Sequence, residues 1–306
     1  MLQVQNLTKR YGNVLAVNDL SFSIEGNGVY GFLGPNGAGK STTMNIVTGC
    51  LSASAGKITV GGFDILDNPM EAKAAIGYLP ENPPLYLDMT PVEYLDFVAM
   101  AKGVAKKDRK EAIAKVIEAT GLSEMQGRLI KKLSKGYKQR VGIAQAIIGS
   151  PKIIILDEPT EGLDPLQRIE IRNLILDLGK EHVVILSSHI LSEIAAVADK
   201  ILIIARGELK AFDTPEKLES DYGSNGLEEL VINLTKDSEE LAAEAAWEEA
   251  KAAKAAEAEA GESCECCECE ECAEESCECS ECAEECCECA ENAECEEKEA
   301  CDESDL

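Results

Sequence analysis

Cysteine is almost absent from the first 236 residues, and the chain has no long apolar run. Of its 14 cysteines, only Cys50 lies within residues 1–236. A body with one thiol is not a disulfide scaffold, which favours a reducing compartment. The N-terminal residues MLQVQNLTKRYG contain no apolar h-region, so no signal peptide is expected. The longest aliphatic runs, residues 153–156 and 201–205, are far shorter than the roughly 20 residues of a spanning helix. A soluble, cytoplasmic protein is therefore expected.

A basic surface is also missing from the composition. The formal net charge is -28, but residues 237–306 hold 28 Asp and Glu against three Lys. The remaining 29 acidic and 26 basic residues leave residues 1–236 close to neutral, near -3. Neither the nearly neutral residues 1–236 nor the acidic residues 237–306 provide the positively charged surface that nucleic-acid binding requires. We therefore expect no nucleic-acid partner.

Apolar periodicity divides the body into a β-rich start, a helical middle and a β–α end. Helical spacing recurs between about residues 91 and 150, and a further helix is expected at residues 40–50. Strands are predicted at 2–12, 14–24, 28–34, 57–60, 152–156, 183–187 and 200–205, with helices at 165–179 and 191–198. Strands that alternate with helices predict an α/β core with a mainly parallel sheet.

A phosphate-binding loop is the strongest motif. Residues 34–42, GPNGAGKST, match GxxxxGK[ST] between an apolar strand and a helical segment. Glycines let backbone N–H groups surround phosphate oxygens, and the helix N-terminus adds positive potential. Lys40 would reach the β- and γ-phosphates, and the Ser41 hydroxyl would ligate Mg²⁺. The alternative, a glycine-rich turn without a ligand, explains neither of these side chains.

Two acidic residues end an aliphatic strand downstream of this loop. Residues 153–156 are followed by Asp157 and Glu158, and the carboxyl ends of parallel strands form the ligand-binding edge of α/β sheets. Asp157 is placed for a Mg²⁺ shell and Glu158 for polarising an attacking water. Acidic residues at strand ends are common, but the upstream phosphate loop favours the functional interpretation.

Residues 133–140, LSKGYKQR, resemble the LSGGQ-like signature of ATP-binding-cassette (ABC) nucleotide-binding domains. The order of motifs in residues 2–218 is similar to that family throughout. Its aromatic A-loop matches Tyr11, its D-loop matches Gly162-Leu163-Asp164, and its switch histidine matches His189. Within the family, residues 76–86, 133–146 and 226–235 are most similar to drug-export and gliding-motility ATPase subunits.

The resemblance implies an ABC ATPase subunit with a P-loop core, an N-terminal antiparallel β-subdomain and a helical subdomain at about 85–150. It implies catalytic roles for Lys40, Glu158 and His189, and Mg²⁺ ligation by Ser41, Asp157 and Glu81. The implied ATP-binding set is Tyr11, Gly34, Pro35, Asn36, Gly37, Ala38, Gly39, Lys40, Ser41, Thr42, Glu81, Ser134 and Gly136.

The same resemblance implies two partners. Two cassettes would close head to tail over ATP, with Ser134 and Gly136 of one facing the phosphate loop of the other. A separate transmembrane permease would contact the helical block around residues 81–103 and hold the chain at the cytoplasmic face of the membrane. The domain prediction is 1–236 for the cassette.

Two positions depart from the family pattern. Glu81 stands where the family usually has the glutamine of the Q-loop, and it adds negative charge near the phosphates. Lys135 stands where the first signature glycine is expected, and it would add positive charge near a γ-phosphate.

The cassette does not explain the C-terminal part. Residues 237–260 are rich in Ala, Glu and Lys and predict a solvated helix, while residues 261–306 repeat a Cys/Glu decapeptide and predict disorder. Their 13 cysteines are compatible with soft-metal capture, with a role in partner docking, or with an inert low-complexity tail. Cys50, at the end of a predicted buried helix, is expected to serve packing.

The sequence bears on two other function classes. A soluble ABC ATPase acting on ribosomes or DNA usually carries two cassettes or a long coiled coil, and this chain has neither. A metal-binding protein with a degenerate cassette is the third class, but the residues needed for hydrolysis are all present.

Overall fold

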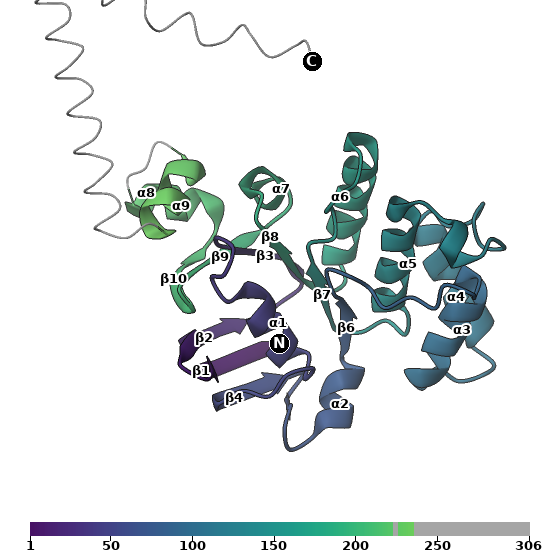
Figure 1. The fold of residues 1–306 in the computed structure, drawn as a ribbon, viewed down its shortest axis with the longest axis horizontal. Coiled ribbons are helices and arrows are strands. Elements are labelled where there is room, and N and C mark those ends of the chain that lie inside the picture. The colour runs from purple at the N-terminus through teal and green to yellow at the C-terminus, as the bar shows by residue number, and fades with distance from the viewer. Residues whose placement is uncertain (223–225, 236–306) are drawn as a thin grey trace, which may run out of the picture. The chain divides into compact units, whose positions relative to one another are not determined.

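Two β-sheets form the framework of the chain in the computed structural model, which describes residues 1–222 and 226–235 (Figure 1). The described residues belong to one compact unit, Met1–Leu241. The first sheet has the order β2-β1-β4-β5, and all its pairs are antiparallel. Its strands are β1 (Leu2–Tyr11), β2 (Val14–Ile24), β4 (Ala55–Val60) and β5 (Phe63–Asp64).

The second sheet has the order β10-β9-β3-β8-β7-β6. Its strands are β3 (Gly28–Leu33), β6 (Ile76–Leu79), β7 (Ile153–Asp157), β8 (Val183–Ser188), β9 (Lys200–Ala205) and β10 (Glu208–Asp213). All pairs are parallel except β9 with β10. These two are joined through Arg206 and Gly207, whose φ angles of 54° and 76° suit a tight hairpin.

The helices are α1 (Lys40–Val47), α2 (Pro69–Ala74), α3 (Pro91–Ala101), α4 (Arg109–Ala119), α5 (Lys135–Ile147), α6 (Pro165–Gly179), α7 (Leu191–Ala195), α8 (Pro215–Tyr222) and α9 (Leu227–Thr235), with a 3₁₀ turn at Ile130–Lys132. Local chemistry sets several boundaries. At the start of α6, Asp164 accepts a hydrogen bond from the Gln167 N–H at 2.9 Å, and Pro165 follows at the first helical position.

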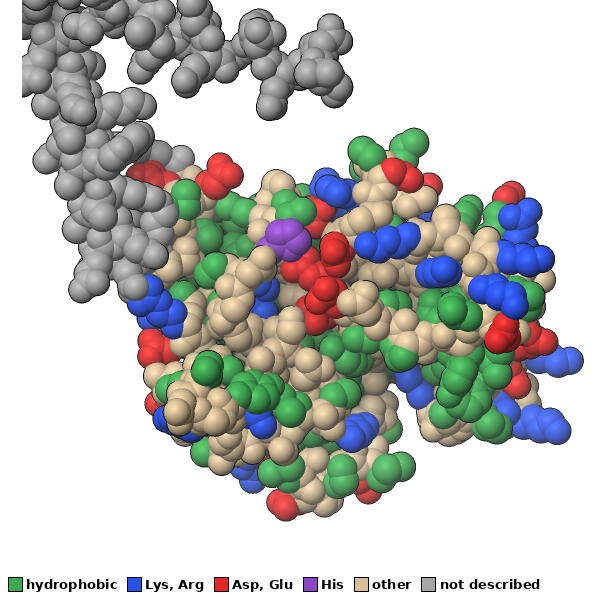
Figure 2. All heavy atoms as spheres, in the orientation of Figure 1, with side chains coloured by type: hydrophobic (Ala, Val, Ile, Leu, Met, Phe, Trp, Pro, Cys, Tyr) green, Lys and Arg blue, Asp and Glu red, His purple; other side chains and the backbone are tan. Residues whose placement is uncertain are grey.

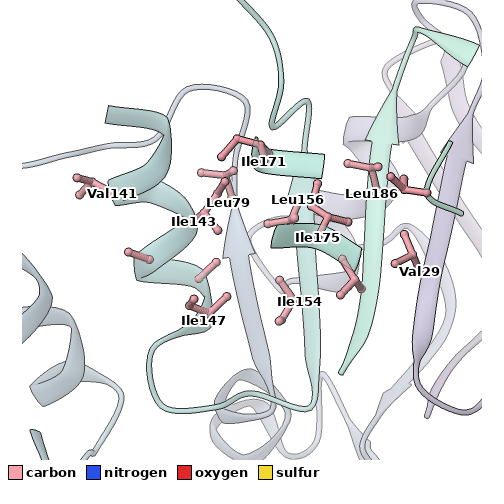
Figure 3. Packing of buried hydrophobic residues seen from close by; sticks show 14 of the residues in the cluster. Val29, Leu79, Val141, Ile143, Ile147, Ile154, Leu156, Ile171, Ile175 and Leu186 are labelled. Carbon is pink, nitrogen blue, oxygen red and sulfur yellow. The ribbon is translucent and has the colours of Figure 1, made fainter. Parts of the chain in front are cut away.

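The pleat of the six-stranded sheet separates two hydrophobic cores. In β7, Ile154 and Leu156 pack with the helices, as the close view of the core shows (Figure 3). Ile153 and Ile155 point to the opposite face and pack against the antiparallel sheet and α1. Because successive side chains of a strand alternate between faces, a strand covered on both faces must be apolar throughout. The run IIIL therefore marks the centre of the fold.

The predicted fold class is confirmed for the described residues: an α/β cassette with a mainly parallel core, an antiparallel N-terminal sheet and a helical block. Helix α1 ends at Val47, however, and Cys50 lies beyond it with an exposed side chain. The expectation that Cys50 serves packing is therefore wrong, because Gly49, at φ 69°, ends the helix first.

The predicted segments 237–260 and 261–306 lie outside the described residues, as does the possible soft-metal site. Among the described helices, none has the length and apolar character needed to cross a membrane. The predicted domain boundaries stay predictions.

The contact between β6 and α5 makes a test of the packing. A Cβ added at Gly77 would lie 2.0 Å from the Ala146 carbonyl oxygen, so the strand and helix would have to separate. We expect Gly77→Ala to lower the free energy of unfolding by about 1–3 kcal/mol in urea denaturation. Gly127→Ala is the control, because an added Cβ there meets no described atom within 4 Å. Equal midpoints for the two variants would contradict the close packing.

Candidate active site

The phosphate loop joins β3 to α1 and requires glycine for two different reasons. A Cβ at Gly34 would lie 2.1 Å from the Ile204 carbonyl oxygen, so a side chain has no space there. Gly39, immediately before α1, has φ 100°, and its added Cβ would approach the Ala16 carbonyl oxygen at 2.5 Å. The loop can therefore curl back against β2 and β9 while its following helix points its N-terminus at the loop opening.

Lys40 is the first residue of α1 and its side chain is drawn into the loop. Its Nζ donates to the carbonyl oxygens of Gly34 at 2.7 Å and Pro35 at 3.2 Å. Burial lowers the pKa of the ammonium group, and the nearby negative charges of Glu158 and Asp157 oppose that effect. The two carbonyl oxygens thus hold the ammonium group inside the loop. Phosphate oxygens bound in the loop would replace them as its hydrogen-bond partners.

Asp157 ends β7 with its carboxylate buried, at 3% exposure. The Ser187 hydroxyl on the neighbouring strand β8 donates to Asp157 Oδ1. Strand pairing sets Asp157 directly opposite Ser187, so the hydrogen bond follows from the register. A hydroxyl donor satisfies one carboxylate oxygen and fixes the orientation of the other.

Glu158 follows in an unusual backbone conformation, with φ 48°. Its N–H lies 3.2 Å from the Ser187 carbonyl oxygen and 3.3 Å from the Ser187 hydroxyl. Its Oε1 lies 3.1 Å from Nδ1 of His189, the residue just after β8. Burial raises the pKa of Glu158, and the contact with His189 and the charge of Lys40 work in the opposite direction. A carboxylate and an imidazole therefore meet above the phosphate loop.

Lys40, Glu158 and His189 help to line a cavity of about 310 Å³, which Asp157 does not line. It is lined by Ala16, Asn36, Gly37, Gly39, Lys40, Ser41, Thr42, Glu81, Glu158, Glu161 and His189. Figure 2 shows a histidine beside a group of acidic side chains on this face, with basic side chains gathered over the helical block. Nine predicted site residues thus line one cavity, and the three glutamates there face a single lysine.

Other predicted residues lie elsewhere. The Ser134 hydroxyl caps α5 by accepting from the Tyr137 N–H at 3.4 Å, and its side chain is exposed. Gly136 is buried against Gln167, whose Oε1 would lie 2.1 Å from an added Cβ. Tyr11 is 48% exposed, with the Lys9 ammonium 5.1 Å from its ring centre. None of these three lines the cavity, and neither do the loop residues Gly34, Pro35 and Ala38.

Ser187, Ala16 and Glu161 contribute to the site but were not predicted. Ser187 belongs to a run of two serines before His189, and a polar residue at the carboxyl end of a buried strand was the available signal. Ala16 comes from β2, and nothing in its local sequence indicates a contact with the phosphate loop.

Comparison with known proteins agrees with this geometry. The family model described as ABC transporter matches residues 17–161. The linearmycin resistance ATP-binding protein of Bacillus subtilis is 37% identical over 234 residues, which cover 76% of this chain and 75% of the relative. The chain belongs to the ABC transporter family. A lantibiotic transport ATP-binding protein of Streptococcus pyogenes is 40% identical over 235 residues, covering 76% and 96%.

Solved structures share the fold of this ABC protein. The ATP-binding subunit of an ABC transporter covers 77% of this chain and 100% of its own, with a TM-score of 0.71 and 30% identity. A dimeric ATP-binding cassette in a post-hydrolysis state, bound to ADP and Pi, has a TM-score of 0.64 and 22% identity over 70% of this chain and 98% of its own. The predicted family, its relation to antibiotic-transport ATPases, and the activity of an ATP-hydrolysing transport subunit are confirmed.

The three glutamates of the cavity make nucleotide affinity sensitive to charge. Glu81→Gln removes one negative charge from the wall that faces the phosphates, and we expect Mg²⁺-free ATP to bind about fivefold more tightly, or about 1 kcal/mol. Equilibrium binding of a fluorescent ATP analogue in EDTA measures this effect. Glu71→Gln, an exposed change of equal charge on α2, should leave the affinity unchanged. Weaker binding by Glu81→Gln in EDTA would contradict the repulsion.

Proposed function

We propose that this chain powers export through a separate membrane permease by closing and opening an ATP-dependent dimer. The arrangement of Lys40, Glu158 and His189 around one cavity carries the proposal, because it provides both phosphate binding and activation of water. The names of relatives in linearmycin resistance and lantibiotic transport support an exported, antibiotic-like substrate.

In the proposed reaction, Glu158 accepts a proton from a water molecule whose oxygen bonds to the γ-phosphorus, while the bond from that phosphorus to the β-phosphate oxygen breaks and ADP leaves with phosphate as the second product. His189, in contact with the same carboxylate at 3.1 Å, orients Glu158 and helps to align the phosphate. Lys40 exchanges its bonds to Gly34 and Pro35 for phosphate oxygens and neutralises part of their charge. Backbone N–H groups of residues 36–42 complete the cradle.

The oxygen ligands at the cavity also suit Mg²⁺, which prefers hard oxygen donors. Ser41 offers a hydroxyl at the first turn of α1, and Asp157 offers a carboxylate whose orientation is fixed by Ser187. We infer that Ser41 and Asp157 would hold the ion and that Glu81, which also lines the cavity, would be a further ligand. When bound, the ion withdraws charge from the phosphate oxygens.

A second cassette would complete the site. Ser134 is exposed at the N-terminus of α5, and Tyr11 is exposed at the end of β1, outside the cavity of their own chain. We propose that Ser134 and Gly136 face the γ-phosphate of the partner's nucleotide and that Tyr11 stacks on adenine. A cassette of the same fold that is described as dimeric and bound to ADP and Pi supports dimerisation.

An exposed apolar group on the helical block would receive the permease. It consists of Tyr86, Leu87, Val92, Phe97 and Met100, which are between 36% and 53% exposed. Tyr86 makes edge contacts with Tyr94 and Phe97, at centroid distances of 6.0 and 5.4 Å. Exposed apolar side chains on one block of helices favour a protein partner, and we propose that they anchor the chain at the cytoplasmic face of the membrane.

Glu158→Gln tests the proposed chemistry. The amide keeps the size of the side chain but cannot accept the proton, so ATP should bind and close the dimer while turnover falls about 10²-fold or more. Size-exclusion chromatography with ATP and a phosphate-release assay measure the two effects. Glu118→Gln, an exposed change of equal charge on α4, should match the wild type. Wild-type turnover by Glu158→Gln would remove Glu158 from this role.

Phe97→Asp tests the anchoring surface. A carboxylate in the apolar group should reduce the fraction of the chain that sediments with membranes of the source cells by at least about tenfold, because burying an unpaired charge is costly. Leu66→Asp, at an exposed apolar residue before α2 (68% exposed), is the control. The ATPase activity of the purified chain should be unchanged in both variants. Equal sedimentation of the two variants would place the permease contact elsewhere.

A further inference from the structure

Glu193 is a largely buried acidic residue on α7, four positions after His189, and no role has yet been assigned to it. Its side chain is 12% exposed. Its Oε2 accepts hydrogen bonds from the Thr160 hydroxyl at 2.5 Å and from the Ser188 hydroxyl at 3.4 Å. A carboxylate in such a position needs partners to offset its desolvation. The partners here come from two different segments of the active site.

Those two segments are the ones that present Glu158 and His189. Thr160 lies two residues after Glu158, and Ser188 lies immediately before His189. The Ser188 hydroxyl also accepts from the Ile190 N–H at 3.1 Å, so it holds the backbone on both sides of His189. One carboxylate oxygen therefore joins the loop after β7 to the turn after β8. The contact between Glu158 and His189 spans the same gap on the cavity side.

The second oxygen of Glu193 extends this link to α6. Among the described residues, Oε1 of Glu193 is buried and receives no hydrogen bond. The guanidinium of Arg168 lies 3.6 Å from it, and Arg168 Nε donates to the Leu163 carbonyl oxygen at 3.1 Å. Leu163 belongs to the same loop as Thr160. Arg168 thus fixes the far end of the loop and supplies the positive charge that faces Glu193.

We propose that Glu193 is a positioning residue for hydrolysis, which holds His189 against Glu158 by fastening the His189 turn to the loop at residues 158–163. The inference rests on the proposed roles of Glu158 and His189. Glu193 lines no part of the cavity and touches no reacting group, so its effect must pass through these two residues. A displacement of about 1 Å at such a contact can cost about 10²-fold in rate.

The test measures ATPase kinetics of the full chain with variants on both sides of the link. Glu193→Ala should lower kcat at least about tenfold while KM for ATP changes less than about threefold, because the phosphate loop is untouched. Glu193→Gln should recover part of kcat, because its amide oxygen can still accept from Thr160. Thr160→Val should lower kcat and Thr160→Ser should restore it. Ser192→Ala, an exposed neighbour on α7, is the matched control.

A double-mutant cycle with His189→Ala separates positioning from general destabilisation. If Glu193 acts through His189, the double variant should be no slower than His189→Ala alone. Multiplicative losses, or a fall in kcat for Ser192→Ala equal to that for Glu193→Ala, would overturn the inference. If His189→Ala itself retained wild-type kcat, the proposed catalytic role of His189 would fail instead, so the two failures are distinguishable.

Discussion

The register of β8 with its two neighbours determines the active site. Leu33 of β3 pairs with Ser188, and Asp157 of β7 pairs with Ser187. The phosphate loop, the two acidic residues and His189 therefore leave the sheet at the same edge. A slip of one residue would move the side chains of β8 to the opposite face. Asp157 would then lose its contact with Ser187, and His189 would lose its contact with Glu158. The buried faces of these strands prevent that slip, because it would expose two apolar cores at once.

The charge distribution in the cavity explains how a site with excess negative charge can bind a polyanion. Lys40 donates hydrogen bonds to two carbonyl oxygens of its own loop. In the absence of nucleotide, these bonds offset the cost of burying its charged ammonium group. Backbone N–H groups and the N-terminus of α1 would add further attraction for phosphate. These groups are not paired with a negatively charged side chain that a nucleotide would have to displace. The carboxylates of Glu81, Glu158 and Glu161 line the same cavity and would repel the phosphates of a bound nucleotide.

The sequence was sufficient for features that depend on local chemistry and insufficient for those that depend on distant backbone. The phosphate loop is readable because glycine spacing and Lys40 are local requirements, and α6 has its predicted bounds because Asp164 and Pro165 define its start. The contacts of Ser187 and Glu193 could not be predicted from the sequence, because their partners lie 30 and 33 residues away along the chain. The error at Cys50 has a different and local cause: α1 ends at Val47, and Gly49 follows with a positive φ before Cys50 is reached.

The conformation of Glu158 links this fold to its reaction. A left-handed backbone costs a side-chain-bearing residue about 1–2 kcal/mol, yet Glu158 adopts it at φ 48°. Bonds from its N–H to Ser187, and from the Glu161 N–H to its carbonyl oxygen, offset that cost and turn the chain sharply after β7. The turn directs the Glu158 side chain to His189, while Thr160 returns to the protein interior. The strand register that places the phosphate loop beside β8 therefore also maintains the strain at Glu158.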